Sequence, residues 1–248
     1  MEGHRIYVGT SGWSVLSGPE RRALGGPGPL LARYGRVFPA VEVNTTFYRS
    51  HRPGTYARWA ELVPEGFRFA VKMPRWITHL GRLRRLDGLE PFLTEVRHLG
   101  PKLGPVLVQL PPSLRYDPEP VEAFFAALRG LYDGPCACEG RHGSWFSEEA
   151  GAMLGRWRIA RVVADPAPIP AEPEPGGCGE LVYVRLHGRP RMYYSAYAPA
   201  ELEAWIGRLL RWAKRGPVWC FFNNTASQEG LENARYTWER LQAECGSP

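Results

Sequence analysis

Eight short runs of apolar, β-rich residues, spread along the whole 248-residue chain, constrain its fold more than any other feature. Strands that are apolar on both faces are typical of parallel sheets covered by helices, and helical patterns separate most of these runs. Eight such units predict a closed barrel rather than an open sheet, so we expect an α/β fold, a single (β/α)8 TIM-type barrel. The runs are Ile6–Gly9, Ala40–Asn44, Phe67–Lys72, Pro105–Gln109, Cys136–Glu139, Ile159–Ala164, Leu181–Leu186 and Val218–Phe222.

Amphipathic segments supply the helices between these runs. Apolar residues recur at a spacing of 3.6 after Pro199 and again in the last stretch of the chain, and Ser147 precedes two glutamates as a helix N-cap would. The first strand–helix unit is harder to predict because glycine and proline interrupt it at 25–29. The expected helices are Gly54–Leu62, Leu89–Leu99, Glu119–Leu131, Ser147–Arg156, one between Pro199 and Gly216, and a final one through Leu231–Leu241.

A proline-rich stretch, Pro166–Gly179, is the one segment that resembles a linker. Its five prolines exclude a regular helix. Only two strand-like runs follow it, too few for a second core, so we expect an irregular loop after strand six. The sequence therefore predicts a single domain over residues 1–248.

Composition and charge limit the classes of function. No apolar run approaches the ~18 residues of a membrane helix, and no signal sequence is evident, so we expect a cytoplasmic protein without a membrane partner. The five cysteines do not form a disulfide framework. A net charge of +6 favours anionic partners, although much arginine with little lysine also fits a GC-rich genome. The sequence does not fix the oligomeric state.

Strands two to eight each end in polar or charged residues. In a barrel of this kind the carboxyl ends of the strands share one mouth, where ligands bind. Side chains two apart share a face, which pairs Glu42 with Asn44, Glu139 with Arg141 and Arg185 with His187 in that mouth. The same alternation turns Cys136 and Cys138 outward, toward the helices. Any one polar residue could serve only as an internal salt bridge or cap, so the functional argument depends on the whole set.

The residue types at these strand ends indicate an anion site with acid–base groups. Lys72, Arg141 and Arg185 could clamp a phosphate or carboxylate, and Glu139 and His187 could exchange protons as the catalytic pair. The alternative for Glu139 is that it and Arg141 only brace strand five. The remaining expected substrate-binding residues supply hydrogen bonds or ring faces, and they are Glu42, Asn44, Gln109, Asn223, Trp13 and Tyr48.

Seven segments, in order across the chain, carry a recognisable set of motifs: Gly9–Trp13, Val41–Arg49, Phe67–Lys72 with Thr78 and His79, Gln109–Pro112, Glu139–Trp145, Tyr183–Arg189 and Phe221–Asn224. Together they resemble the YecE-like family, domain of unknown function seventy-two. The resemblance implies a TIM-type barrel and no established activity. Two departures from the family pattern are Val15 in place of an aromatic, which would widen the pocket rim, and Gly140 in place of a bulky residue, which would loosen the strand carrying Glu139.

Three functions remain open from the sequence. The first is an enzyme, a hydrolase, lyase or isomerase, that acts on an anionic small molecule without an organic cofactor. The second is a divalent-metal-dependent hydrolase or phosphodiesterase with ligands from Glu42, Glu139, Asp165 and His187, which the cations in the same mouth would oppose. The third is a non-catalytic protein that binds nucleic acid or an anionic metabolite, which we do not favour. Its stacking platforms would be Trp13, Tyr48, Trp145 and Tyr193.

Overall fold

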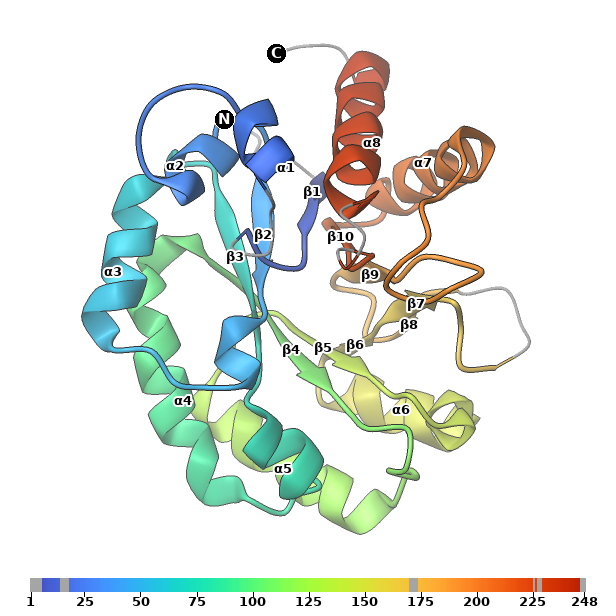
Figure 1. The fold of residues 1–248 in the computed structure, drawn as a ribbon. Coiled ribbons are helices and arrows are strands. Elements are labelled where there is room, and N and C mark those ends of the chain that lie inside the picture. The colour runs from blue at the N-terminus through green and yellow to red at the C-terminus, as the bar shows by residue number, and fades with distance from the viewer. Residues whose placement is uncertain (1–5, 14–17, 170–173, 225, 227–228, 246–248) are drawn as a thin grey trace.

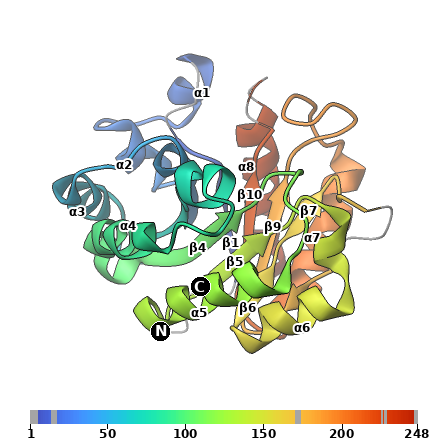
Figure 2. The ribbon, with the colours of Figure 1, turned by 90° about the horizontal axis from the view of Figure 1, so that it is seen from below.

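The computed structural model describes residues 6–13, 18–169, 174–224, 226 and 229–245. Its helices surround its strands, with α3 and α4 on the opposite side of the barrel from α6 and α7 in both views (Figures 1 and 2). The strands are β1 (Ile6–Thr10), β2 (Ala40–Val43), β3 (Arg68–Lys72), β4 (Leu103–Gln109), β5 (Cys136–Glu139), β6 (Ile159–Arg161), β7 (Val163–Asp165), β8 (Gly176–Gly177), β9 (Val182–Leu186) and β10 (Val218–Phe222).

The helices follow the expected segments closely. Ser147 caps α6, its hydroxyl accepting from the Ala150 amide at 3.2 Å, as the sequence predicted. Short 3-10 turns are formed by Thr45–Phe47, Leu86–Gly88, Arg97–Lys102 and Gly143–Phe146, and Trp76–Leu80 forms a π-helical turn. The α-helices are α1 (Gly18–Ala23), α2 (Leu30–Tyr34), α3 (Pro53–Leu62), α4 (Leu89–Val96), α5 (Pro118–Leu131), α6 (Glu148–Arg156), α7 (Pro199–Ala213) and α8 (Glu229–Cys245).

Parallel pairing joins the strands into two arcs of a TIM-type barrel, as predicted. One arc has the order β1-β10-β9-β7, and the other begins β2-β3-β4-β5-β6. The expected sixth strand is divided at Val162 into β6, which pairs with β5, and β7, which pairs with β9, so this one stretch links the arcs. In the proline-rich loop, β8 pairs with β6 in the antiparallel direction.

The tyrosine hydroxyl of α2 closes the other junction, between β1 and β2. Tyr34 Oη accepts from the Thr10 amide at 2.8 Å and lies 3.2 Å from the Ala40 carbonyl oxygen, to which it donates. A Cβ at Gly9 would lie only 2.0 Å from that same oxygen, so glycine is needed for the approach of the two strands. A side-chain bridge thus takes the place of regular strand pairing at this seam.

Alternation along the strands separates an interior layer from an outer one. The outward-facing Cys136 and Cys138 pack with the apolar residues that face the helices, as predicted. Inside the barrel, alanines on β2, β3, β5 and β6 face large aromatic rings on β9 and β10. Small side chains on one wall leave room for the large ones on the other, so the interior is filled. The interior cluster comprises Ala40, Ala70, Leu107, Ala137, Ala160, Val162, Leu181, Tyr183, Trp219 and Phe221.

None of the helices in the described ranges has both the length and the apolar character needed to cross a membrane.

Candidate active site at the barrel mouth

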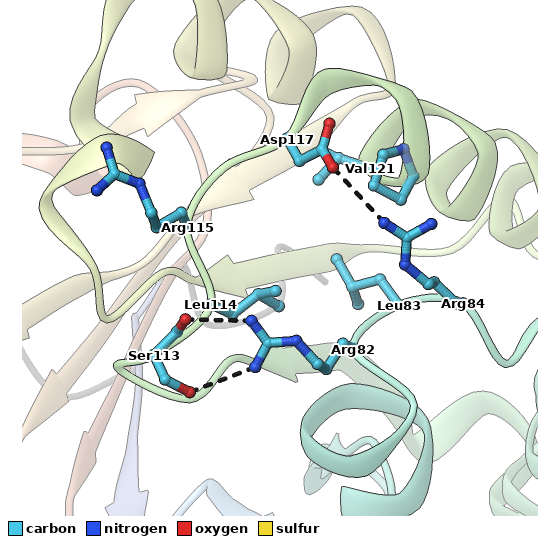
Figure 3. A pocket seen from close by; sticks show the side chains of 9 residues that line it. Arg82, Leu83, Arg84, Ser113, Leu114, Arg115, Asp117 and Val121 are labelled. Carbon is cyan, nitrogen blue, oxygen red and sulfur yellow. Dashed lines mark hydrogen bonds and ion pairs between the residues drawn. The ribbon is translucent and has the colours of Figure 1, made fainter.

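An outer cavity of about 220 Å³ lies between the loop at 82–84 and the segment leading into α5 (Figure 3). Arg82 donates to the Ser113 carbonyl at 3.1 Å, and Arg84 lies 3.6 Å from an Asp117 carboxylate oxygen, with both partners of that pair more than half exposed. Two of its arginines therefore already have protein partners in a solvated setting, where ion pairs contribute little. This cavity is a weak candidate for a ligand site.

A larger cavity, of about 760 Å³, opens at the carboxyl ends of the strands. Its wall is cationic and amide-rich, with aromatic rings at its side, and no aspartate or glutamate is among the described residues that line it. A ligand here would meet positive charge and hydrogen-bonding groups rather than carboxylates. The lining residues are Asn44, Phe47, Tyr48, Lys72, Arg75, His79, Gln109, Leu110, Pro112, Arg141, Tyr193, Asn223 and Ala226.

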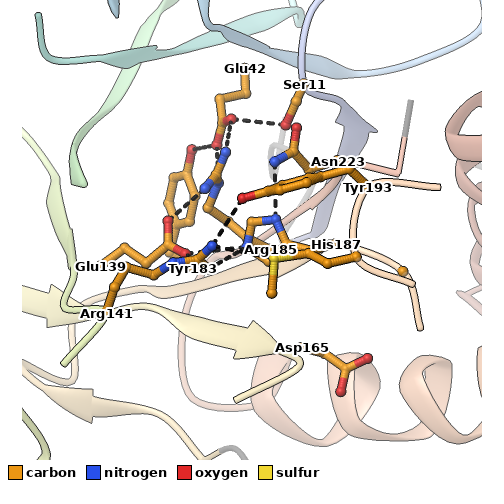
Figure 4. A network of polar contacts seen from close by, with 12 residues as sticks. Ser11, Glu42, Glu139, Arg141, Asp165, Tyr183, Arg185, His187, Tyr193 and Asn223 are labelled. Atoms are coloured by element: carbon orange, nitrogen blue, oxygen red, sulfur yellow. Dashed lines mark hydrogen bonds and ion pairs between the residues drawn. The ribbon is translucent and has the colours of Figure 1, made fainter. Parts of the chain in front are cut away.

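Beneath this cavity, Arg185 of β9 joins two carboxylates from different strands (Figure 4). Its Nε and Nη2 donate to the two oxygens of Glu42 at 2.9 and 2.8 Å, and its Nη1 donates to Glu139 Oε2 at 2.5 Å. All three side chains are at most 1% exposed. The guanidinium forms two parallel hydrogen bonds to the Glu42 carboxylate. Such geometry helps a buried ion pair to offset the free energy of hydration that both groups lose.

Further donors complete both carboxylates. Tyr183 Oη donates to Glu42 Oε2 at 2.8 Å, and Ser11 Oγ donates to Oε1 at 2.9 Å. Arg141 Nη1 donates to Glu139 Oε1 at 2.7 Å. Burial by itself would raise the pKa of each carboxyl, but Arg185 outweighs it and leaves the pKa of Glu42 below its usual range and, with Arg141, that of Glu139 well below. Both glutamates are therefore ionised.

His187 lies between Glu139 and the amide of Asn223. Its Nε2 is 3.2 Å from Glu139 Oε1, and its Nδ1 is 3.0 Å from Asn223 Nδ2. Nε2 also lies 3.1 Å from Arg141 Nη1, which can only donate, so this nitrogen faces both the carboxylate acceptor and a guanidinium donor. Burial lowers the pKa of this fully buried imidazole more than Glu139 raises it, so the ring is neutral at physiological pH.

Arg141 connects this network to the cavity wall. While Nη1 contacts Glu139, its Nη2 donates to Tyr193 Oη at 3.0 Å (Figure 4). Tyr193 is held in turn by its backbone amide, which bonds to the His187 carbonyl. The guanidinium is thus fixed at the boundary between buried network and cavity.

Lys72, at the end of β3, is a largely buried basic residue of the cavity wall. Its side chain is 8% exposed, and Nζ lies 3.8 Å from the centre of the Phe47 ring. Burial, followed by repulsion from Arg185, lowers the pKa of Lys72 to about 7. Burial and the nearby Lys72 likewise lower the pKa of His79 to about 4. A large fraction of Lys72 is therefore uncharged near neutral pH.

The mouth brings together most of the residues that the sequence selected. The structure places Glu42, Glu139, Arg185 and His187 in the buried network, and it places Arg141 at the boundary. Asn44, Tyr48, Lys72, Gln109 and Asn223 line the cavity above it. Arg185, expected in the ligand clamp, is instead fully engaged by the two glutamates.

Three residues do not join the site. Trp13 packs edge-on against Trp59, with ring centres 5.0 Å apart, and does not line the cavity. Trp145, expected as a stacking platform, is only 1% exposed, so that expectation was wrong. Asp165 accepts from Tyr197 at 2.7 Å and lies apart from the network (Figure 4).

The two family departures differ in outcome. Val15 lies outside the described residues. At Gly140, a Cβ would lie 2.3 Å from the Trp145 ring, so the buried indole occupies the space that a bulkier residue would take. Packing against Trp145 thus supports the segment that carries Glu139.

Among the ring-bearing and charged residues of the cavity wall, sequence reasoning missed Phe47, Arg75 and His79. All lie in segments that follow β2 or β3, two or more residues beyond the strand end. Reading the loop after each strand, as well as its last residue, would have found the Arg75 cation three positions after Lys72. Among the residues that the structure describes, no group of three or more His, Cys, Asp or Glu is arranged to hold a metal ion.

Similar proteins agree with this architecture. YecE of Escherichia coli K12, a UPF0759 protein, is 27% identical over 265 residues, which cover 96% of this chain and 93% of the relative. YunF of Bacillus subtilis 168, also UPF0759, is 26% identical over 96% of this chain and 95% of its own.

The solved structures lead to the same conclusion. A crystal structure of a DUF72 family protein from Thermotoga maritima superposes with a TM-score of 0.83 at 28% identity, covering 96% of this chain and all of that one. A fusion protein with a xylose isomerase-like TIM barrel matches with a TM-score of 0.52 at 15% identity over 98% of this chain and 44% of that one, a likeness of fold alone. Residues 7–247 match the family described as "Protein of unknown function DUF72", and the chain therefore belongs to the DUF72 family.

Proposed function

We propose that this protein is an enzyme that acts on a small molecule bearing a phosphate or carboxylate, bound in the cavity at the barrel mouth. One observation supports this most. Lys72, Arg75 and Arg141 line a cavity of about 760 Å³ in which no described lining residue is acidic, because the two nearby glutamates are bound to arginines beneath it. Such a wall favours an anionic group.

The fixed orientation of Arg141 suits it to recognise that group. Its bonds to Glu139 and Tyr193 restrict the guanidinium before any ligand arrives, so less conformational entropy is lost on binding. The neutral groups of the wall would orient the rest of the molecule. Asn44 Oδ1 is buried and has no hydrogen-bond donor in the described structure, so a ligand hydroxyl or amine would satisfy it.

Glu139 and His187 remain our candidates for the catalytic pair, with roles that their surroundings restrict. An ionised carboxylate that accepts from two arginines is a weak proton acceptor, which favours Glu139 as the group that holds Arg141 and orients the His187 ring. Lys72, whose pKa is near 7, is better matched to proton transfer at neutral pH. The proposal covers hydrolase, lyase and isomerase chemistry alike.

A metal-dependent hydrolase is a weaker proposal, because the carboxylates that would bind the metal already have protein partners. Arg185 occupies both Glu42 and Glu139, and Asp165 bonds to Tyr197 instead. Binding of nucleic acid would have to use Tyr48, which is 72% exposed, and Tyr193 at the rim. Measuring oligonucleotide affinity against salt concentration tests it, because phosphate contacts weaken steeply as salt rises.

Titration calorimetry with inorganic phosphate tests the leading proposal. We expect saturable binding by the wild type and at least about tenfold weaker binding by Arg141→Met, since a charge-assisted pair contributes roughly 1.5–3 kcal/mol. Arg115→Met, in the exposed outer cavity, is the matched control and should bind as the wild type does. Equal loss in both variants, or no binding at all, would refute the proposal.

A further inference from the structure

The amine of Lys72 lies at the cavity wall against an aromatic ring. Among the described residues no acceptor lies within hydrogen-bonding distance of Nζ and no carboxylate within 4 Å; the close contact is the face of the Phe47 ring at 3.8 Å. The backbone of Lys72 is fixed, because its carbonyl accepts from Thr46 Oγ1 at 2.7 Å. The side chain is only 8% exposed. This is an unusual setting for lysine, which is rarely buried without a partner.

Charged groups from five strands or loops face this amine. Glu42 on β2 and Glu139 on β5 attract a proton to it, while Arg185 on β9 and Arg141 after β5 repel one. His79 lies in the turn after β3 and is itself affected by Lys72 and Arg75. Both carboxylates accept instead from arginine, tyrosine or serine donors, and among the described residues neither forms an ion pair with Nζ. Burial outweighs the attraction of the carboxylates and lowers the pKa of Lys72 to about 7, so a large fraction of the amine is neutral at that pH.

Resting on the proposed function, we infer that Lys72 is a nucleophile that forms an imine with an aldehyde or ketone carbonyl of the anionic ligand. A neutral, fixed amine adds reversibly to such a carbon without an organic cofactor. The Arg141 guanidinium at the same wall would hold the phosphate or carboxylate of that ligand. The substrate class is therefore a carbonyl compound that carries an acidic group.

The step balances without an oxidant or reductant. The nitrogen lone pair forms the C–N bond while the carbonyl π electrons move to oxygen, which takes a proton and gives a carbinolamine. The nitrogen lone pair then forms the C=N double bond as the protonated hydroxyl leaves as water, which gives an iminium, and loss of the N–H proton yields the neutral imine. Tyr193 is suited to protonate the leaving hydroxyl, because its oxygen accepts from Arg141 and its own proton stays available.

Reductive labelling with glyoxylate and cyanoborohydride at pH 7 tests this inference on the full chain. Glyoxylate is a small anionic aldehyde, and the reduced imine adds its mass less one oxygen atom. The chain has only three lysines, Lys72, Lys102 and Lys214, so peptide mapping by mass spectrometry separates them. Exposed Lys214 is the internal control. The variants Lys72→Met and Lys214→Met confirm which peptide carries each label.

We expect Lys72 to be labelled at least about tenfold faster than Lys214, because burial lowers the pKa of Lys72 to about 7. Inorganic phosphate should slow labelling at Lys72 and leave Lys214 unchanged. If Lys72 reacts no faster than Lys214 while calorimetry still detects phosphate at the mouth, the nucleophile is disproved and the anion site stands. If phosphate neither binds nor protects, the proposed function fails independently of the labelling rate.

Discussion

Arg185 and Glu42 form a two-point ion pair inside the barrel, with nitrogen–oxygen distances of 2.9 and 2.8 Å and both side chains at most 1% exposed. This pair links β9 to β2 inside the barrel. The two residues are 143 positions apart in the sequence. It also keeps Glu42 away from the cavity above. The cationic wall of that cavity depends on this arrangement.

Breaking that pair should destabilise the fold strongly. Arg185→Met leaves two buried carboxylates without their shared partner, and we expect a loss of about 3–5 kcal/mol of unfolding free energy in denaturant titrations. The matched control is Arg156→Met, which removes an ion pair to Glu122 whose two side chains are 58% and 42% exposed, and it should cost less than about 1 kcal/mol. Similar losses in both variants would contradict the assigned role of Arg185.

The Tyr34 hydroxyl should matter because it bridges β1 and β2. Tyr34→Phe keeps the buried ring but leaves the Thr10 amide without its acceptor, so we expect a loss of about 1–3 kcal/mol, measured by urea unfolding. Tyr7→Phe, which keeps the stacking of that ring on Trp219, is the control and should change stability by much less. If Tyr34→Phe is as stable as the wild type, the seam does not rely on this bridge.

The strands of this fold could be predicted because their apolar runs are continuous and end sharply. The run Cys136–Glu139 coincides with β5, and Phe67–Lys72 differs from β3 by one residue. The division of strand six at Val162 depends on which neighbour each half pairs with, and the pairing of β8 with β6 depends on where a proline-rich loop returns. These are three-dimensional relationships that local patterns do not contain.

The site was predictable in outline for a similar reason. Alternation correctly placed Glu139 beside Arg141, and it placed Arg185 and His187 on one face, where both contact Glu139. Alternation could not tell which basic residue would form ion pairs with the buried carboxylates and which would line the cavity. That depends on how far each side chain extends across the barrel. Arg185 was expected to face a ligand and is buried, while Arg75 was missed although it lines the cavity.

Lys72 should produce a characteristic dependence of stability on pH. Its pKa is about 7 in the fold and near 10.5 ordinarily, so between these values the unfolded chain binds a proton that the folded chain does not. Wild-type stability should therefore rise relative to Lys72→Met by up to about 1.4 kcal/mol per pH unit from pH 7 to 10. Denaturant unfolding at several pH values measures this. A pH-independent difference would show that Lys72 stays protonated.

Glu139→Gln separates a structural from a proton-carrying role. At neutral pH the neutral amide should cost about 3–5 kcal/mol of stability, because Arg141 loses its anion and Arg185 loses one of its two. The folded carboxyl has the lower pKa, so its contribution is present above the unfolded pKa of about 4.3 and disappears as pH falls toward the folded value. Exposed Glu61→Gln is the control. A turnover loss of ~10²-fold with unchanged stability would instead identify Glu139 as the proton carrier.

The most direct measurement of the central claim is a crystal structure of the wild type soaked in inorganic phosphate, combined with calorimetry to exclude an adventitious ion. We predict an ordered anion in the mouth cavity, within hydrogen-bonding distance of Arg141 and at least one of Lys72 and Arg75. A mouth that contains only water, with ordered anions confined to outer arginines such as Arg84 and Arg115, would contradict the anion site.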